Sequence, residues 1–480
     1  MSAAFFVPGR IEVLGKHTDY AGGRSLLCAI DRGIRVEVVA RGTDRIRITD
    51  AVSGETIELD PAAASEGIGS GAASEGIGSG AATGDDARWP EGPAHRARPA
   101  EGPAHRAGEA AARGWRIYPA TVVRRAARDF GVPLRGCDIV FESDLPAAAG
   151  LSSSTALVSA LFLALDAVSG LRASEAGRRA LPDDEALASY LSAVERGSAY
   201  AGLGGAAPGV GIRGGGEDHV AVLCGVEGAL VRYSFEPTRF EGSVPIPAVW
   251  SFAVASSGVR AEKSGAARDR YNRLSDLAAR AASLWRDATG GAEPHLGAIL
   301  RTAAPVRERI AAPVDAQDEA PLDADTRGAV LDRLMSLIRA ATSGSERDAL
   351  LVRVEQFALE SETIVPAAAH ALAAGDTAAF RALVERSQAA AERLLGNQVA
   401  ETIGLVHAAR DLGAAAASAF GAGFGGAVWA LVRTDEASAF LDEWQRSYEA
   451  AFPVHARESE FFITRPGPPA RPCAANLFRR

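Results

Sequence analysis

A row of hydroxyl side chains follows a glycine where a loop is expected to become a helix. The segment Leu145-Pro-Ala-Ala-Ala-Gly-Leu-Ser-Ser-Ser-Thr155 leads into an apolar stretch from Ala156 to Val168. Backbone N–H groups and the positive end of a helix dipole converge at such a junction, and serine hydroxyls add further donors. A helix cap alone needs only one serine. The pattern favours a phosphate-binding loop, but not a Walker A loop, because no Gly-Lys-Ser/Thr follows.

Several polar side chains are packed between glycines near the N-terminus. The segment Pro8–Gly23 contains Arg10, Lys16, His17, Asp19 and Tyr20. A loop constrained in this way can present several polar groups to one small ligand, and sugar hydroxyls suit such a mixture. Taken alone, the segment also fits a polar turn with a solvated cluster of charges.

Three further features could contribute to a reaction. The segment Gly214-Gly-Gly-Glu-Asp-His219 offers a carboxylate that could accept the proton of an attacking hydroxyl, although a flexible loop ending in a helix cap fits it as well. Glu195 is by itself an ordinary helix carboxylate, but it is also the hard oxygen ligand that Mg²⁺ on a nucleotide requires. The glycines of Gly421–Gly426 allow close approach of a backbone, or form a hairpin turn.

The elements that would position these residues follow from hydrophobic periodicity. Alternating residues in Ile34–Val39 and Ile46–Ile48 predict strands. Further strands are predicted at 138–141, 414–420 and 426–432, and helices at 115–130, 156–168, 185–196, 261–286, 327–341, 347–374 and 377–395. We therefore predict an α+β chain in two lobes, the first rich in strands and the second rich in helices.

Residues 61–114 differ in character from the rest of the chain. Two short segments of small and polar residues are each duplicated in tandem there, and they cannot bury a core. We predict a disordered surface insertion, whose His95 and His105 repeat with the segment and give no support for a metal site. The N-terminal lobe is then expected at 1–60 and 115–255, and the C-terminal lobe at 256–480.

Composition narrows the class of protein. The 480 residues include 51 Lys and Arg against 60 Asp and Glu, a net charge of -9, so no global field attracts nucleic acid or anionic lipid. The most apolar window, Ala156–Ala167, contains Asp166 and is too short to cross a bilayer, and no secretion signal is expected. The four cysteines form no CxxC pair, which fits a reducing cytoplasm. The oligomeric state stays open, and a monomer is plausible.

Taken together and in this order, these segments resemble the GHMP kinase superfamily and, within it, the galactokinases. Residues 9–20 resemble the galactokinase signature, Gly-Arg-x-x-x-x-Gly-Glu-His-Thr-Asp-Tyr, and continue with Cys28-Ala-Ile-Asp31. The serine segment resembles the ATP loop of the superfamily, and Gly423-Phe-Gly-Gly426 resembles its third motif. The three motifs span nearly the whole chain apart from the repeat insertion. The resemblance implies a two-lobed fold with a ribosomal-protein-S5-like first lobe.

The resemblance also implies a reaction and roles for single residues. The γ-phosphoryl group of ATP, with Mg²⁺, would pass to the anomeric hydroxyl of a hexose, galactose or a related sugar. Asp218 would be the catalytic aspartate, with Arg10 stabilising charge on it and on the transferring group. The sugar-binding residues would be Lys16, His17, Thr18, Asp19 and Arg268. The ATP loop would comprise Ala148, Ala149, Gly150, Leu151, Ser152, Ser153 and Ser154. Ser154 and Glu195 would bind Mg²⁺.

Three positions depart from the family pattern. Lys16 stands where galactokinases carry a glutamate that contacts the sugar, Arg268 falls where they have a sugar-contacting tyrosine, and Ala148 replaces a glycine. A cation in the pocket would favour an acidic sugar such as a hexuronate, because it pairs with a carboxylate. Alternatively, Lys16 points to solvent or neutralises Glu12 or Asp19, and neutral sugar binding remains intact.

Two other functions compete with a galactokinase-like sugar kinase. One is a hexuronate kinase or another GHMP kinase that acts on a different small molecule. The other is a sensor that binds sugar and ATP without catalysis. Because Arg10, Ser154, Glu195 and Asp218 are all present, the sensor is the less favoured of these alternatives.

Overall fold

The computed structural model describes residues 2–62, 115–146, 149–204, 209–259, 265–301 and 324–477. Nearly all of the insertion predicted at 61–114 lies outside these ranges, as does Ala148 of the predicted ATP loop.

The first half of the chain forms a large sheet around two long strands, β1 (Ser2–Leu14) and β2 (Arg24–Ala40). The sheet order is β12-β1-β2-β5-β3-β4, and β6 pairs with both β2 and β7. The remaining bounds are β3 (Ile46–Asp50), β4 (Thr56–Leu59), β5 (Cys137–Ser143), β6 (Ala229–Ser234), β7 (Arg239–Pro245) and β12 (Arg471–Pro472). The register of β1 on β2 shifts between Pro8 and Arg10 and again between Glu12 and Leu14. Such irregularities change the direction in which side chains point, and both lie within the polar segment Pro8–Gly23.

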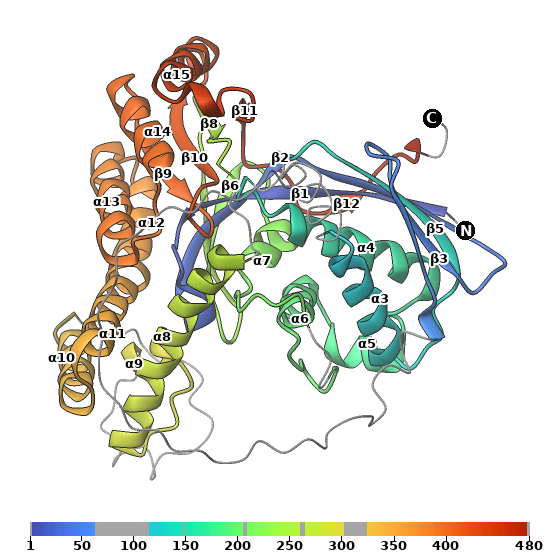
Figure 1. Ribbon diagram of the computed structural model, residues 1–480, viewed down its shortest axis with the longest axis horizontal. Coiled ribbons are helices and arrows are strands. Elements are labelled where there is room, and N and C mark those ends of the chain that lie inside the picture. Colours follow the sequence, from blue (N-terminus) through green and yellow to red (C-terminus); the bar gives the residue numbers. More distant parts are fainter. Residues whose placement is uncertain are drawn as a thin grey trace, which may run out of the picture.

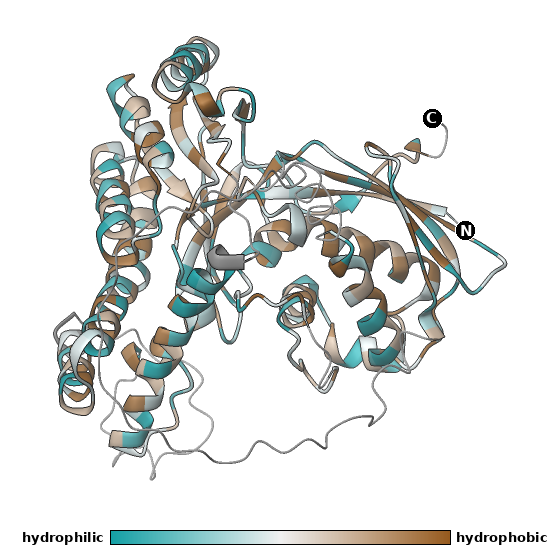
Figure 2. Cartoon of the chain, viewed as in Figure 1, coloured by the Kyte–Doolittle hydropathy of each residue, from teal (hydrophilic) through white to brown (hydrophobic). Residues whose placement is uncertain are grey.

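Helices of the first half cover one face of this sheet (Figure 1). They are α3 (Ile117–Asp129), α4 (Ser153–Ser169), α5 (Glu175–Ala180), α6 (Asp184–Arg196) and α7 (Glu217–Cys224). Helix α4 packs against both β1 and β2, and most of its residues are buried. Figure 2 shows hydrophobic residues along α4 and polar residues recurring along α8 (Gly265–Thr289), which lies nearer the surface.

The second half combines a smaller antiparallel sheet with a group of helices. The sheet has the order β11-β8-β10-β9. Its strands are β8 (Trp250–Ser256), β9 (Ala416–Phe420), β10 (Ala427–Arg433) and β11 (Glu460–Thr464). The other helices are α9 (Leu296–Leu300), α10 (Ala324–Ala341), α11 (Gly344–Phe357), α12 (Val365–Ala373), α13 (Thr377–Ala390), α14 (Ala400–Asp411) and α15 (Ala437–Ala451). Two π-helical segments, η3 (Ala358–Ile364) and η4 (Ala391–Leu395), continue α11 and α13.

The predicted α+β architecture in two lobes is confirmed. Two details differ from the expected division of the chain. Strand β8 pairs with β10 and β11 of the second sheet, so the boundary expected at 255/256 cuts through it. The chain also returns to the first sheet at its end, where β12 pairs with β1. Among the described helices, none is both long and apolar enough to span a bilayer.

Candidate active site

Residues 15–23 and the first residue of β2, called here the 15–24 loop, connect β1 to β2 and have an unusual backbone. Gly15, His17 and Gly22 all have positive φ, at 119°, 59° and 74°. A Cβ on Gly15 would lie 2.4 Å from the Ser25 hydroxyl, so only glycine fits there. The hydroxyl of Thr18 lies 2.7 Å from the Gly15 carbonyl oxygen and so closes the turn. The glycines therefore serve the close packing of this loop, and Thr18 holds its shape.

The His17 side chain is buried and uncharged. Burial, and next the Arg353 guanidinium, lower its pKa to about 3. Its Nε2 lies 3.1 Å from the Ala422 carbonyl oxygen, which can only accept, so Nε2 carries the proton. Its Nδ1 then accepts from the Tyr20 hydroxyl at 2.9 Å. His17 thereby ties the 15–24 loop to the loop that follows β9.

Arg10 and Asp218 form a close ion pair between β1 and the first turn of α7. Arg10 Nη2 and Nε lie 2.6 and 2.7 Å from Asp218 Oδ1. Arg10 Nη1 also donates to the Gly150 carbonyl oxygen of the serine loop. Burial by itself lowers the pKa of Arg10, but Asp218 and Glu217 outweigh it and raise the pKa above its ordinary value. One guanidinium thus connects the predicted catalytic carboxylate to the predicted phosphate loop.

Two more carboxylates lie beside this pair. Asp19 Oδ2 accepts from the backbone N–H of Glu217 at 3.3 Å, and Glu217 Oε2 accepts from the Ser25 hydroxyl at 2.8 Å. Burial and the neighbouring Asp218 raise the pKa of Asp19 to about 6. The pKa of Glu217 lies well above its usual range because the group is buried, and because Glu12 and Asp19 are near. Glu217, which was not predicted as a site residue, is therefore part of the charge balance of the site.

A small pocket gathers several of the predicted residues. It is lined by Asp19, Thr155, Ser192, Glu195, Arg196, Ile212, Gly214, Gly215, Glu217, Asp218, His219 and Tyr271. Glu195 enters it from the end of α6, with Oε1 3.8 Å from Nε2 of His219. The structure thus brings Asp19, Glu195 and Asp218 to one place from three distant segments.

Tyr271 lines the pocket and was not predicted from the sequence. Its ring centroid lies 5.0 Å from that of His17 and 6.0 Å from that of Tyr20. Arg268, which was predicted to bind substrate, lies about one helical turn earlier on α8, is partly exposed, and has Nε 3.5 Å from Asp269 Oδ1. Arg268 is not among the lining residues. In the sequence, Tyr271 could have been noticed as an aromatic residue three positions after Arg268, on a predicted helix that is otherwise rich in charged residues.

Lys16 does not line this pocket either. Its side chain is buried, with only 1% of the residue exposed, and Nζ donates to the Ser387 hydroxyl of α13 at 3.1 Å. The proposed orientation toward solvent is therefore wrong. Burial raises the pKa of Glu12 to about 7 and Lys16 is the first of the neighbouring charges that oppose this rise, so neutralisation of Glu12 by Lys16 stays a prediction.

The serine loop has the geometry of an anion cradle at the start of α4. Gly150 and Ser152 have φ of 76° and 59°, and α4 begins at Ser153. Within the described part of the chain, the buried hydroxyls of Ser152 and Thr155 have no hydrogen-bond partner. Ala149 and Leu151 are buried below the loop, whereas Ser153 and Ser154 are half-buried. Free hydroxyls beside a helix N-terminus fit a phosphate group.

The third glycine-rich segment packs directly against this cradle. A Cβ on Gly421 would lie 3.1 Å from the Gly150 carbonyl oxygen, and the Gly421 N–H donates to Glu12 Oε2 at 3.1 Å. The three motifs found in the sequence therefore meet around Arg10.

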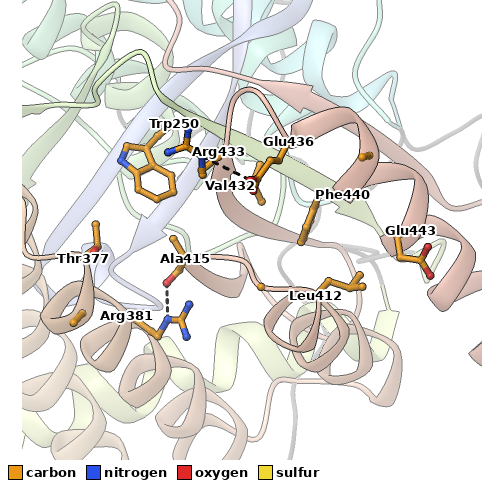
Figure 3. Close-up of a pocket in the computed structure, with 13 residues that line it drawn as sticks. Trp250, Thr377, Arg381, Leu412, Ala415, Val432, Arg433, Glu436, Phe440 and Glu443 are labelled. Carbon is orange, nitrogen blue, oxygen red and sulfur yellow. Dashed lines mark hydrogen bonds and ion pairs between the residues drawn. The ribbon is translucent and has the colours of Figure 1, made fainter.

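A second pocket lies at one end of the smaller sheet, between α13, α15 and the start of β8 (Figure 3). Trp250, Arg381 and Phe440 are among its lining residues, and Arg381 Nε donates to the Ala415 carbonyl oxygen at 2.9 Å. None of the catalytic, substrate-binding, ATP-binding or metal-binding residues predicted from the sequence lines this second pocket.

Comparison with known proteins gives matches along the chain. The model of the galactokinase galactose-binding signature matches residues 2–39, that of the GHMP kinase N-terminal domain residues 118–225, and that of the GHMP kinase C-terminal domain residues 368–450. A galactokinase of Exiguobacterium sibiricum is 31% identical over 163 residues, 34% of this chain and 31% of the relative. A galactokinase of Bacillus subtilis is 27% identical over 155 residues, 32% of this chain and 29% of the relative. The alignments thus span about three tenths of these relatives.

Solved structures share the fold over nearly the full length. The galactokinase of Lactococcus lactis, solved in complex with galactose, superposes with a TM-score of 0.64 at 19% identity, covering 98% of this chain and 95% of that one. A mevalonate kinase superposes with a TM-score of 0.50 at 13% identity, covering 97% and 98%. The chain therefore has the GHMP kinase fold, matches the galactokinase signature and both GHMP kinase domain models, and brings all three sequence motifs together in one site.

Proposed function

We propose that this protein is an ATP-dependent sugar kinase of the galactokinase type, which phosphorylates the anomeric hydroxyl of a neutral hexose, galactose or a close relative. The observation that carries the proposal is the Arg10–Asp218 ion pair, held between the serine loop and the small pocket. In this proposal Asp218 is the proton acceptor for the sugar hydroxyl, and Arg10 is the fixed positive charge beside the transferring phosphate.

The reaction follows from these positions. Asp218 accepts the proton of the sugar hydroxyl as its oxygen forms a bond to the γ-phosphorus, while the bond to the β-phosphate oxygen breaks and ADP leaves. The guanidinium of Arg10, already fixed by Asp218 and the Gly150 carbonyl, neutralises charge on the transferring group. Phosphoryl transfer depends mainly on such positioning and charge neutralisation.

The serine loop is the proposed triphosphate site. The open hydroxyl of Ser152 and the N-terminus of α4 fit phosphate oxygens, and Ser153 and Ser154 stand at the start of the helix. Ser154 and Glu195 are the residues that would hold Mg²⁺, which would neutralise phosphate charge when bound. The described residues contain no ready-made group of three metal-ligating His, Cys, Asp or Glu side chains. Glu195 lines the small pocket and Ser154 stands in the first turn of α4, and a carboxylate and a hydroxyl are the kind of oxygen donor that Mg²⁺ would take there.

The charges of the pocket favour a neutral sugar over a hexuronate. Its lining includes four carboxylate side chains and one arginine, and that Arg196 already pairs with Glu236 at 2.7 Å. The two cations that suggested an acidic sugar, Lys16 and Arg268, do not line the pocket. A hexuronate would therefore place its carboxylate beside acidic side chains, whereas sugar hydroxyls could donate to Asp19 and its neighbours.

The test is release of ADP by the purified protein with MgATP against neutral hexoses, amino sugars and hexuronates. Asp218→Asn should lower turnover on the accepted sugar by about three orders of magnitude or more and leave ATP binding measurable by calorimetry. The exposed Asp332→Asn on α10 is the matched control and should keep wild-type turnover. Activity retained in Asp218→Asn would refute the role of Asp218, and sugar binding without turnover in the wild type would favour the sensor.

A further inference from the structure

One face of α11 and η3 holds the backbone of the 15–24 loop through several bonds. Glu360 Oε1 accepts from the N–H groups of Gly15 at 2.9 Å and Lys16 at 3.3 Å. Gln356 Nε2 donates to the Lys16 carbonyl oxygen at 3.0 Å, and Arg353 Nη2 donates to the His17 carbonyl oxygen. Three successive residues of the loop are thus fixed by side chains from the other half of the chain.

The loop bonds part of its own backbone, such as the Thr18 N–H to the Gly15 carbonyl, but the N–H groups of Gly15 and Lys16 are bonded by Glu360. Positive φ at Gly15 and His17 takes the chain out of the β1–β2 ladder, and the site is buried. A buried N–H or carbonyl group without a partner costs free energy comparable to a lost hydrogen bond. Glu360 and Gln356, exposed by 0% and 1%, therefore provide the hydrogen bonds that strand pairing or water would otherwise provide to this segment.

A buried carboxylate such as Glu360 needs a counter-charge. Ser387 on α13 donates to Glu360 Oε1 at 2.9 Å, and Lys16 Nζ donates to the same Ser387 hydroxyl at 3.1 Å. The ammonium group of Lys16 is therefore linked to the carboxylate that holds its own backbone. Burying a charge is tolerated better when it is hydrogen-bonded near an opposite charge, and here the Ser387 hydroxyl bonds both the ammonium group and the carboxylate.

We propose that Glu360 is a positioning residue for the 15–24 loop, with Lys16 as its buried counter-cation. Lys16, which stands where the family has a glutamate, would then stabilise the loop through Ser387 and Glu360 and would not contact the sugar. The proposal rests on the proposed function in so far as the loop is taken to bind sugar through Asp19. The network of Lys16, Ser387 and Glu360 itself is independent of which ligand binds.

Weakening the hydrogen bonds that Glu360 accepts from the loop should weaken sugar binding and leave ATP binding nearly unchanged. The loop carries Asp19 into the small pocket, whereas Asp218 and the serine loop are held by Arg10. Glu360→Gln keeps the size of the side chain and weakens the charge-assisted bonds to Gly15 and Lys16. We expect the KM for sugar to rise about tenfold, with kcat and the KM for ATP within about threefold of wild type.

Glu355→Gln is the matched control, because Glu355 lies on α11 and is exposed. Hydrogen exchange at the amides of Gly15 and Lys16 should be about tenfold faster in Glu360→Gln and unchanged in Glu355→Gln. If both variants keep the wild-type KM for sugar and the wild-type exchange, Glu360 does not position the loop. A general loss of stability would accelerate exchange throughout the core and not only at the loop.

A double-mutant cycle tests the counter-cation. Lys16→Met leaves Glu360 without its cation, so the denaturation midpoint should fall more than in Glu360→Gln. The double variant should be more stable than Lys16→Met alone, because the unpaired carboxylate is then gone. Additive effects would overturn the pairing. Should the wild type phosphorylate no sugar, the proposed function fails, while the exchange and the cycle still decide this proposal.

Discussion

Tyr271 presents a phenol ring to the same small pocket as Asp19 and Asp218. The pKa of its hydroxyl is well above its ordinary value, because the group is buried and lies near Asp19, so it stays protonated and can donate. Its ring packs against His17 and Tyr20, which fixes its direction. A rigid donor beside two carboxylates is suited to a sugar hydroxyl.

Tyr271→Phe should therefore raise the KM for sugar by roughly tenfold and leave the KM for ATP unchanged, since the ring packing remains. Steady-state kinetics with each substrate varied in turn gives the answer. Tyr448→Phe serves as the contrast, because the Tyr448 hydroxyl donates to the Ser257 carbonyl oxygen at 2.5 Å within the C-terminal lobe. It should lower stability without changing either KM. An unchanged sugar KM in Tyr271→Phe would exclude the hydroxyl from sugar binding.

The candidate catalytic and binding residues could be predicted from the sequence where they lie within short motifs. Arg10, Asp19 and the serine loop stand in short segments whose residue types already indicate a ligand. Tyr271 and Glu360 could not be found in this way. Each lies on a long helix among unremarkable neighbours, and its role depends on which loop the folded chain brings against that helix.

At the scale of elements, periodicity located helices such as α4, α8 and α10 and strands such as β5 and β10. It missed others, among them β6, β8, β11, α14 and α15, and it did not show interruptions within helices. The helix expected at 347–374 is divided into α11, η3 and α12, and the π-helical segment carries Glu360 and Ser361. A single extra residue per turn does not disturb the hydrophobic pattern enough to be seen in the sequence. Such segments often occur at functional sites, and here it turns two side chains toward the 15–24 loop.

The junction of the serine loop with α4 combines backbone strain with an open hydroxyl. A left-handed conformation costs a serine about 1–2 kcal/mol, of which a glycine would recover part. Ser152→Gly should therefore stabilise the protein by on the order of 0.5–1 kcal/mol and raise the KM for ATP by about tenfold, because a phosphate donor is lost. Chemical denaturation and ATP kinetics measure the two effects.

Ala201→Gly is the control for this prediction. Ala201 also has positive φ, 46°, and is exposed outside the lining of the small pocket. It should show the gain in stability alone. If Ser152→Gly keeps the wild-type KM for ATP, the serine hydroxyl does not bind phosphate, and the loop acts through its backbone.

At the scale of the whole molecule, the two lobes meet across buried charges. Glu12 of β1 accepts from the Gly421 N–H of the second lobe, and Lys16 and Glu360 link β1 to η3 and α13. The sequence predicted the lobes, but not that their interface would be ionic. Residues 10–16 and 360–387 are far apart in the chain, and only the folded topology shows which charges face one another.

Glu12 makes this interface sensitive to pH. Burial raises its pKa from 4.5 to about 7; Lys16 and Arg10 oppose that rise, and Glu360 and Asp218 add to it. Glu217 also faces it. The folded protein thus binds this proton more tightly than the unfolded chain does. The stabilisation is fully present below about pH 4.5 and is lost as the pH rises toward 7.

Glu12→Gln should remove this part of the pH dependence while its amide oxygen still accepts from Gly421. Denaturant unfolding at several pH values between 4.5 and 8 should show wild-type stability falling more steeply with rising pH than that of the variant. Asp19 and Glu217 also have raised pKa values and keep some slope of the same sign, whereas His17, with its lowered pKa, opposes it. Parallel curves for the two proteins would mean that Glu12 is ionised in the fold, with Lys16 and Arg10 balancing its charge completely.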